Sequence, residues 1–241
     1  MPAEDPGTER RSGVRGSSPS PGQNGAVTDP EARRRTGGTV LGVLLLVIAL
    51  VGVGWAGYTY VGTDAIASRT YQRERTALRV EWRTAPATPA AAPTPGQPVA
   101  LLRVPRFGPG YEVPVLEGTD ASVLADGVGH YPGTAAAGAV GNFALAGQRI
   151  THGRPFAALL TLQQGDQVVV ETRGAVYTYT IDEPPRQLTV RRGDRWVLDP
   201  VPGRPGERPT AALITLTTGQ DLFRSGDRSV GFGHLQSTTN K

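Results

Sequence analysis

The feature that most constrains the fold is an uncharged apolar stretch at residues 39–60, TVLGVLLLVIALVGVGWAGYTY. As a helix rising 1.5 Å per residue it would reach about 33 Å, close to the thickness of a bilayer hydrocarbon core. Trp55, Tyr58 and Tyr60 cluster at its end, where amphipathic rings favour the membrane interface. The sequence therefore predicts one transmembrane helix over residues 39–60.

The arginines that flank this stretch bear on its orientation. Three arginines at 33–35 directly precede it, and four between 69 and 79 follow at a greater distance. We expect the N-terminus in the cytoplasm and the C-terminal domain outside the cytoplasm, at the cell membrane. The alternative is a signal peptide cleaved after Ala67, because residues 65–67 have the small-x-small form of a cleavage site. The apolar stretch is longer than a usual signal core, which favours a retained anchor.

The rest of the chain divides by composition. Residues 1–38 are rich in Pro, Gly, Ser, Asp, Glu and Arg and predict a disordered cytoplasmic tail. Residues 61–98 predict a stalk, with helix formers at 63–84 followed by a Pro/Ala linker at 85–98. The folded domain is expected at 99–241.

Within residues 99–241 the apolar runs are short and separated by Gly, Pro and Asp turns. Seven runs read as strands, and together they predict an all-β barrel or sandwich. Two brief helical segments are expected at 120–125, after a candidate N-cap at Thr119, and at 156–162. The seven expected strands are 100–104, 112–116, 142–146, 167–171, 176–181, 211–217 and 230–235.

Composition excludes several classes of function. The chain has no cysteine, so it has no disulfide, no cysteine-bound metal and no thiol nucleophile. Its net charge is only +4 and its arginines form no long basic run, so no nucleic-acid partner is expected. The carboxylates at 166, 182, 183 and 194 lack the spacing of a calcium loop. We expect neither a metal nor a cofactor.

Three stretches of residues 99–241 carry a specific pattern: GVGHYPGT at 127–134, GNFALAGQRITHGRPF at 141–156 and LITLTT at 213–218. Together they resemble the sortases, in particular the class E sortases of actinobacteria. The resemblance implies a sortase-type eight-stranded β-barrel with short helices, preceded by one transmembrane helix. It also implies a sorting-signal peptide as substrate, cut after a Thr and transferred to an amine.

Sortases carry out this reaction with a cysteine thiolate, a histidine and an arginine. The resemblance places the histidine position at Gln148, the cysteine position at Gly219 and the arginine position at Arg228. A neutral amide has no proton to give near neutral pH, and glycine has no side chain at all. The sequence therefore predicts a degenerate sortase, a pseudoenzyme without transpeptidase activity.

Three hypotheses about function follow. In the first, the remaining groove binds a sorting-signal-like peptide or a surface protein through Thr217, Thr218, Arg228 and His152. In the second, an active enzyme uses a hydroxyl of Thr217, Thr218 or Ser225 as nucleophile, with His152 as its base. In the third, the barrel is structural and has no ligand.

The remaining charged residues are interpreted as structural or solvated. His130 is interpreted as a structural hydrogen bonder and His234 as facing solvent. The arginines at 191, 192 and 195 are interpreted as a solvated loop, with a basic patch toward anionic lipid or wall polymer as the alternative.

Overall fold

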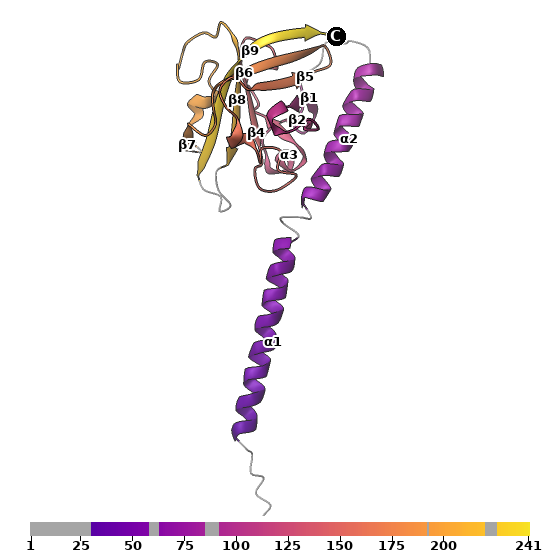
Figure 1. Ribbon diagram of the computed structural model, residues 1–241, viewed down its shortest axis with the longest axis vertical. Coiled ribbons are helices and arrows are strands. Elements are labelled where there is room, and N and C mark those ends of the chain that lie inside the picture. The colour runs from indigo at the N-terminus through magenta and orange to yellow at the C-terminus, as the bar shows by residue number, and fades with distance from the viewer. Residues whose placement is uncertain (1–29, 58–62, 85–91, 192, 220–225) are drawn as a thin grey trace, which may run out of the picture. The chain divides into compact units, whose positions relative to one another are not determined.

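A computed structural model of the chain describes residues 30–57, 63–84, 92–191, 193–219 and 226–241 (Figure 1). The chain forms two compact units, residues 1–49 and 50–241. Two long helices come first, α1 (Pro30–Gly57) and α2 (Thr63–Thr84), and strands dominate the rest. Among the described residues nine strands occur: β1 (Pro98–Arg103), β2 (Val113–Glu117), β3 (Val128–His130), β4 (Gly141–Gly147), β5 (Gln167–Glu171), β6 (Ala175–Glu183), β7 (Thr189–Arg191), β8 (Ala212–Gly219) and β9 (Asp227–Asn240).

Eight of these strands close into a barrel. They follow the order β6-β5-β1-β2-β3-β4-β8-β9, and β9 pairs back onto β6. The short strand β7 pairs only with β9, on the outside of this circuit. Short helices lie in the connections: α3 (Ala121–Asp126) and the 3₁₀ turns η2 (Pro105–Phe107), η3 (Leu159–Thr161) and η4 (Arg195–Leu198). The all-β, sortase-type eight-stranded barrel expected from the sequence is confirmed.

Two of the strand pairings are parallel, β2 with β3 and β4 with β8. All seven residues of β4 are buried, as expected for a strand covered on both faces. The inward-facing side chains fill the barrel with a single apolar core, in which the largest fully buried side chains include Tyr179, Phe143, Phe156, Leu102, Leu145, Ile214 and Leu216. The core thus fixes β4 and β8 side by side, with their carboxyl ends at the same rim.

Each of the seven expected strands occurs; β5 has the predicted bounds, and the ends of the other six are shifted by one to five residues. The helix expected at 120–125 is α3, although its N-cap is Asp120 rather than Thr119. The segment 156–162 forms turns and the 3₁₀ turn η3 instead of an α-helix. The two strands that the sequence did not predict, β3 and β7, are three residues long each.

Helix α2 has the predicted bounds, but it packs on the barrel and is no free-standing stalk. Ala67, Tyr71 and Leu78 are buried along one face, and the first two join the barrel core. This spacing of four and seven residues places them on one side of an α-helix. The Pro/Ala linker is described only from residue 92, and its end already pairs with β2, since Gly96 N donates to Glu117 O at 2.8 Å. The folded part of the chain therefore begins before residue 99.

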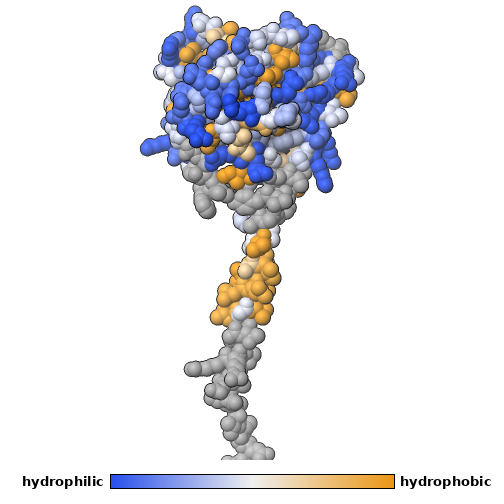
Figure 2. Space-filling view, viewed as in Figure 1, coloured by the Kyte–Doolittle hydropathy of each residue, from blue (hydrophilic) through white to orange (hydrophobic). Residues whose placement is uncertain are grey.

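Helix α1 carries the apolar stretch. Every side chain described on it, residues 41–55, is exposed, and Figure 2 shows this part as a continuous apolar surface. The helix begins at Pro30, so residues 30–38 are helical where the sequence predicted a disordered tail; residues 1–29 lie outside the described part. Of the helices that the structure describes, none combines the length and apolarity needed to cross a membrane.

Candidate functional site

The parallel pairing of β4 with β8 brings the three family positions to one rim of the barrel. In this register Gly147 faces Thr218, so Gln148 follows directly at the end of β4. Gly219, the last residue of β8, is paired with Arg228 on the antiparallel strand β9. Residues 148, 219 and 228 thus lie at the same rim, at the carboxyl ends of β4 and β8. The roles that the resemblance implies for them stay predictions.

A chain of hydrogen bonds runs across the strands below this rim. Arg228 Nη1 donates to the Tyr131 hydroxyl at 2.7 Å, and that oxygen lies 3.2 Å from Thr217 Oγ1. Tyr131 follows β3 directly, and its backbone N donates to Ala144 O of β4 at 3.0 Å. The guanidinium is therefore held beside Thr217 of β8 by a tyrosine. Tyr131 lies within the motif GVGHYPGT at 127–134, but its part in the site was not predicted.

The two threonines expected to bind a peptide are hydrogen-bonded to the backbone of β4. Thr217 Oγ1 donates to Leu145 O at 3.1 Å, and Thr218 Oγ1 donates to Gly147 O at 2.8 Å. Both residues are buried, at 1% and 3% exposed. A hydroxyl nucleophile needs a base within hydrogen-bond reach, and here the hydroxyl protons are directed at backbone carbonyls instead. The structure therefore does not favour a threonine nucleophile, while Ser225 lies outside the described residues.

His152 lies in the loop that follows β4, four residues after Gln148. Its Nδ1 is 2.9 Å from Thr151 Oγ1, and its backbone carbonyl accepts a hydrogen bond from the Tyr71 hydroxyl of α2 at 2.8 Å. His152 and Arg154 have φ values of 56° and 46°, in the left-handed region. Such backbone costs about 1 kcal/mol or more per non-glycine residue and persists where the surroundings hold it.

His130 and Glu117 form a buried side-chain contact in the barrel wall. Its Nδ1 lies 2.7 Å from Glu117 Oε2, and both side chains are less than a tenth exposed. Its Nε2 lies 3.0 Å from Thr134 Oγ1 and 3.1 Å from Ala135 O. The imidazole thus joins β2 to the start of the β3–β4 connection. The structural interpretation of His130 is confirmed.

The other charged residues singled out in the sequence are exposed or paired with an opposite charge. His234 is exposed and pairs with Asp182 at 2.9 Å, so the prediction that it faces solvent is confirmed. Arg191 and Arg195 are exposed, and residue 192 lies outside the described part. Asp166 pairs with Arg106, whose hydrogen bond lowers the pKa of the Asp166 carboxyl. Within the described residues no group of His, Asp and Glu side chains is arranged to hold a metal ion.

Comparisons with known proteins agree with this geometry. Residues 102–236 match the family described as Sortase domain. The chain is 32% identical over 206 residues to Sortase SrtE1 of Streptomyces coelicolor, a match that covers 80% of this chain and 54% of that protein. The chain therefore spans about half the length of this curated relative.

Two solved structures are similar to the chain. Sortase E from Streptomyces avermitilis is 40% identical with a TM-score of 0.55, and the match covers 61% of this chain and 93% of that one. Sortase E1 from Streptomyces coelicolor, solved with a tripeptide in the active site, is 35% identical with a TM-score of 0.53, covering 62% and 94%. The match to the sortase domain covers more than half of this chain, and the similar proteins are sortases of class E. The chain therefore belongs to the sortase family.

Proposed function

We propose that this chain is a membrane-anchored sortase-like protein that binds a sorting-signal-like peptide or surface protein without transpeptidase activity. One observation carries the proposal: Gly219 occupies the strand end opposite Arg228, in a chain that has no cysteine. Without a thiol, the covalent route through a thioacyl enzyme is closed. Gln148 at the end of β4 supplies an amide where a general acid is needed.

Binding is supported by the part of the site that remains. Arg228 and Tyr131 are joined at 2.7 Å beside Thr217, so this rim of the barrel keeps an oriented guanidinium. A guanidinium offers several donors in a fixed plane and suits a peptide carbonyl or carboxylate. The related sortase E1 holds a tripeptide in its active site, which supports the same class of ligand here.

A paired assay tests this function. Cleavage of a sorting-signal peptide, and its binding by titration, would be measured for the native full chain and for the double variant Gln148→His with Gly219→Cys. We expect the native chain to bind peptide without cleaving it and the double variant to cleave. Cleavage by the native chain would contradict the inactive assignment, and absence of binding by both forms would favour the structural barrel.

The anchor rests on a separate observation. The exposed residues 41–55 of α1 form only part of an uncharged stretch at 39–60. That whole stretch, as a helix, would match the thickness of the bilayer core. We expect the full chain to sediment with membranes, with residues 99–241 cleaved by protease added to intact cells. Recovery of the chain in the soluble fraction, or full protection of the domain, would contradict this arrangement.

A further inference from the structure

The loop at 148–156 is closed at its base. Phe156 N donates to Gln148 O at 2.9 Å, so the two ends of the loop are joined. The Phe156 side chain is fully buried and lies against Gly147, where an added Cβ would come within 2.6 Å of the ring. The position of Gln148 at the end of β4 therefore depends on the conformation of the whole loop.

Two tyrosine hydroxyls hold the rest of this loop. Tyr71 on α2 donates to His152 O at 2.8 Å, and Tyr111, before β2, donates to Pro155 O at 2.7 Å. Burial raises the pKa of Tyr111 well above its ordinary value, with a smaller contribution from Tyr71 nearby, so this hydroxyl stays protonated as a donor. The bonds fall on either side of Gly153 and Arg154, where the backbone is left-handed. The loop thus depends on groups outside itself.

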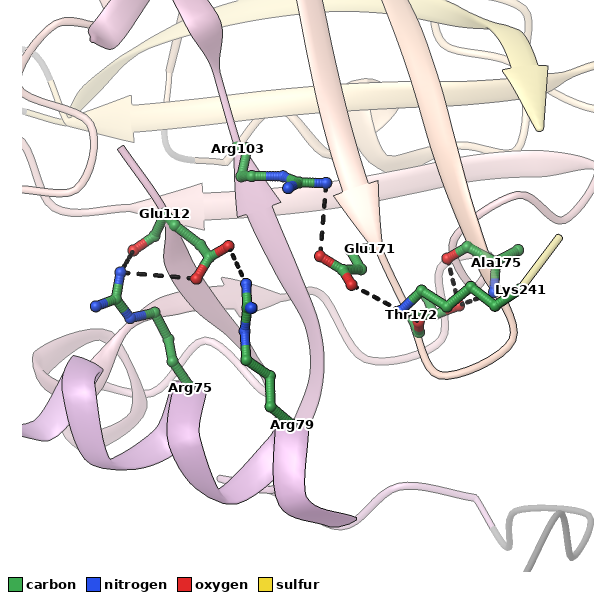
Figure 3. Close-up of polar contacts among 8 residues, drawn as sticks. All are labelled: Arg75, Arg79, Arg103, Glu112, Glu171, Thr172, Ala175 and Lys241. Atoms are coloured by element: carbon green, nitrogen blue, oxygen red, sulfur yellow. Dashed lines mark hydrogen bonds and ion pairs between the residues drawn. The ribbon is translucent and has the colours of Figure 1, made fainter. Parts of the chain in front are cut away.

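Helix α2 is fixed to the barrel next to this contact. Arg79 Nη2 lies 2.6 Å from Glu112 Oε2, and Arg75 Nη1 lies 3.6 Å from Oε1 of the same carboxylate and 3.2 Å from its backbone carbonyl (Figure 3). Tyr71 stands one turn before Arg75, on the same face of the helix. A Cβ at Gly153 would lie 3.0 Å from both Ala67 and Tyr71, so helix and loop are in close contact. The ion pairs therefore set where the Tyr71 hydroxyl meets the loop.

We propose that Tyr71 is a positioning residue for the peptide site. Its hydroxyl holds the 148–156 loop from α2, and the loop in turn sets the positions of Gln148 and His152. This inference rests on the proposed function, because it assumes that the rim receives a peptide. It gives α2, the helix that follows α1 in the chain, a direct part in shaping the site. The hydroxyl is the acting group, since the ring alone would pack as well in a phenylalanine.

Hydrogen exchange of the full chain in detergent tests the loop directly. In Tyr71→Phe we expect the Arg154 and Phe156 amides, both bonded within the loop, to exchange at least tenfold faster than in the native chain. The matched control is Tyr179→Phe, which removes a buried hydroxyl that accepts a bond from Gly138 N at 2.7 Å, away from this loop. Unchanged exchange at Arg154 and Phe156 in Tyr71→Phe would overturn the proposal.

Two further measurements, peptide affinity and the NMR resonance of the His152 imidazole, distinguish positioning of the 148–156 loop from a general stabilisation of the fold. We expect Tyr71→Phe to shift that resonance and to weaken binding of an acetylated pentapeptide containing the Thr cleaved in sortases by about three- to tenfold, well below the unfolding temperature. Faster exchange with native affinity would overturn the role in the groove. If the native chain binds no peptide, the proposed function fails, and exchange with the His152 resonance decides the positioning role alone.

Discussion

The two loops that flank β4 are held by different means. The β3–β4 loop (131–140) is fastened from inside the barrel, by the Glu117–His130 pair and by the Tyr179 hydroxyl on Gly138 N. The 148–156 loop is held by its buried Phe156 and by Tyr111, and in addition by the hydroxyl of Tyr71 on α2. The difference teaches that one wall of the site is part of the barrel's own core, while the other depends also on a helix that precedes it in the chain.

The largest effect is expected at the inner fastening. Glu117→Ala would leave His130 buried without its charged partner and should lower the free energy of unfolding by about 3–5 kcal/mol. Chemical denaturation of the native and variant chains measures this. Glu207→Ala, in the exposed Arg204–Glu207 pair, is the control and should change stability by less than about 0.5 kcal/mol. Equal losses of stability in the two variants would show that the Glu117–His130 contact does not hold the β3–β4 loop.

The next effect concerns the packing of α2. Leu78 is 2% exposed, so Leu78→Ala should cost roughly 2–4 kcal/mol through lost contacts and a cavity. Val80, two residues later, is 52% exposed, and Val80→Ala should change stability by less than about 0.5 kcal/mol. Thermal unfolding of the two variants distinguishes a packed helix from a stalk, because a stalk would give the same small change at both positions.

A pH-dependent effect sharpens the description of the β3–β4 loop. Burial raises the pKa of Tyr179 to about 12, whereas an unfolded tyrosine titrates near 10. The neutral hydroxyl therefore contributes stability in full below pH ~10, and this contribution, about 3 kcal/mol at most, is lost as the pH rises toward ~12. The stability difference between the native chain and Tyr179→Phe should shrink over this window. A constant difference would show that the hydroxyl titrates normally.

The smallest effect is expected at the surface of α2. Arg79 is 44% exposed in its pair with Glu112, and Arg75 remains beside the same carboxylate, so Arg79→Gln should cost about 0.5–1 kcal/mol. Added salt should reduce this cost, since exposed charges are screened. Denaturation of both forms at low and high salt measures it. A cost that does not depend on salt would mean that the side chain acts by packing.

Long elements of the fold could be predicted from the sequence and short ones could not. Strand β5 has the predicted bounds because alternating burial follows its apolar pattern. Strand β3 has three residues with a glycine in the middle, which gives no alternation to read. The helical segment of α2 was predicted, but its buried face was not. That face rests on a small Ala67 and a polar Tyr71, while the more apolar Ile66 and Val80 are exposed.

The same division holds for the site. Positions 148, 219 and 228 follow from motif spacing, and the strand register then brings them together. Tyr131 and Tyr71 were missed because their contacts span 97 and 81 residues of sequence. A tyrosine hydroxyl that meets a distant arginine or a backbone carbonyl leaves no local pattern, so only the folded barrel reveals it.

The closure of the barrel by β9 has a consequence for how the chain folds. This strand pairs with β6, β7 and β8, and its partners on β6 are separated from it by some fifty residues or more. Barrels built on such non-local pairings fold in milliseconds to seconds, slowly for a domain of this size. Until β9 is in place, β6 and β8 each present an open edge that another chain can pair with. Aggregation during folding, through these two edges, is therefore the characteristic hazard of this architecture.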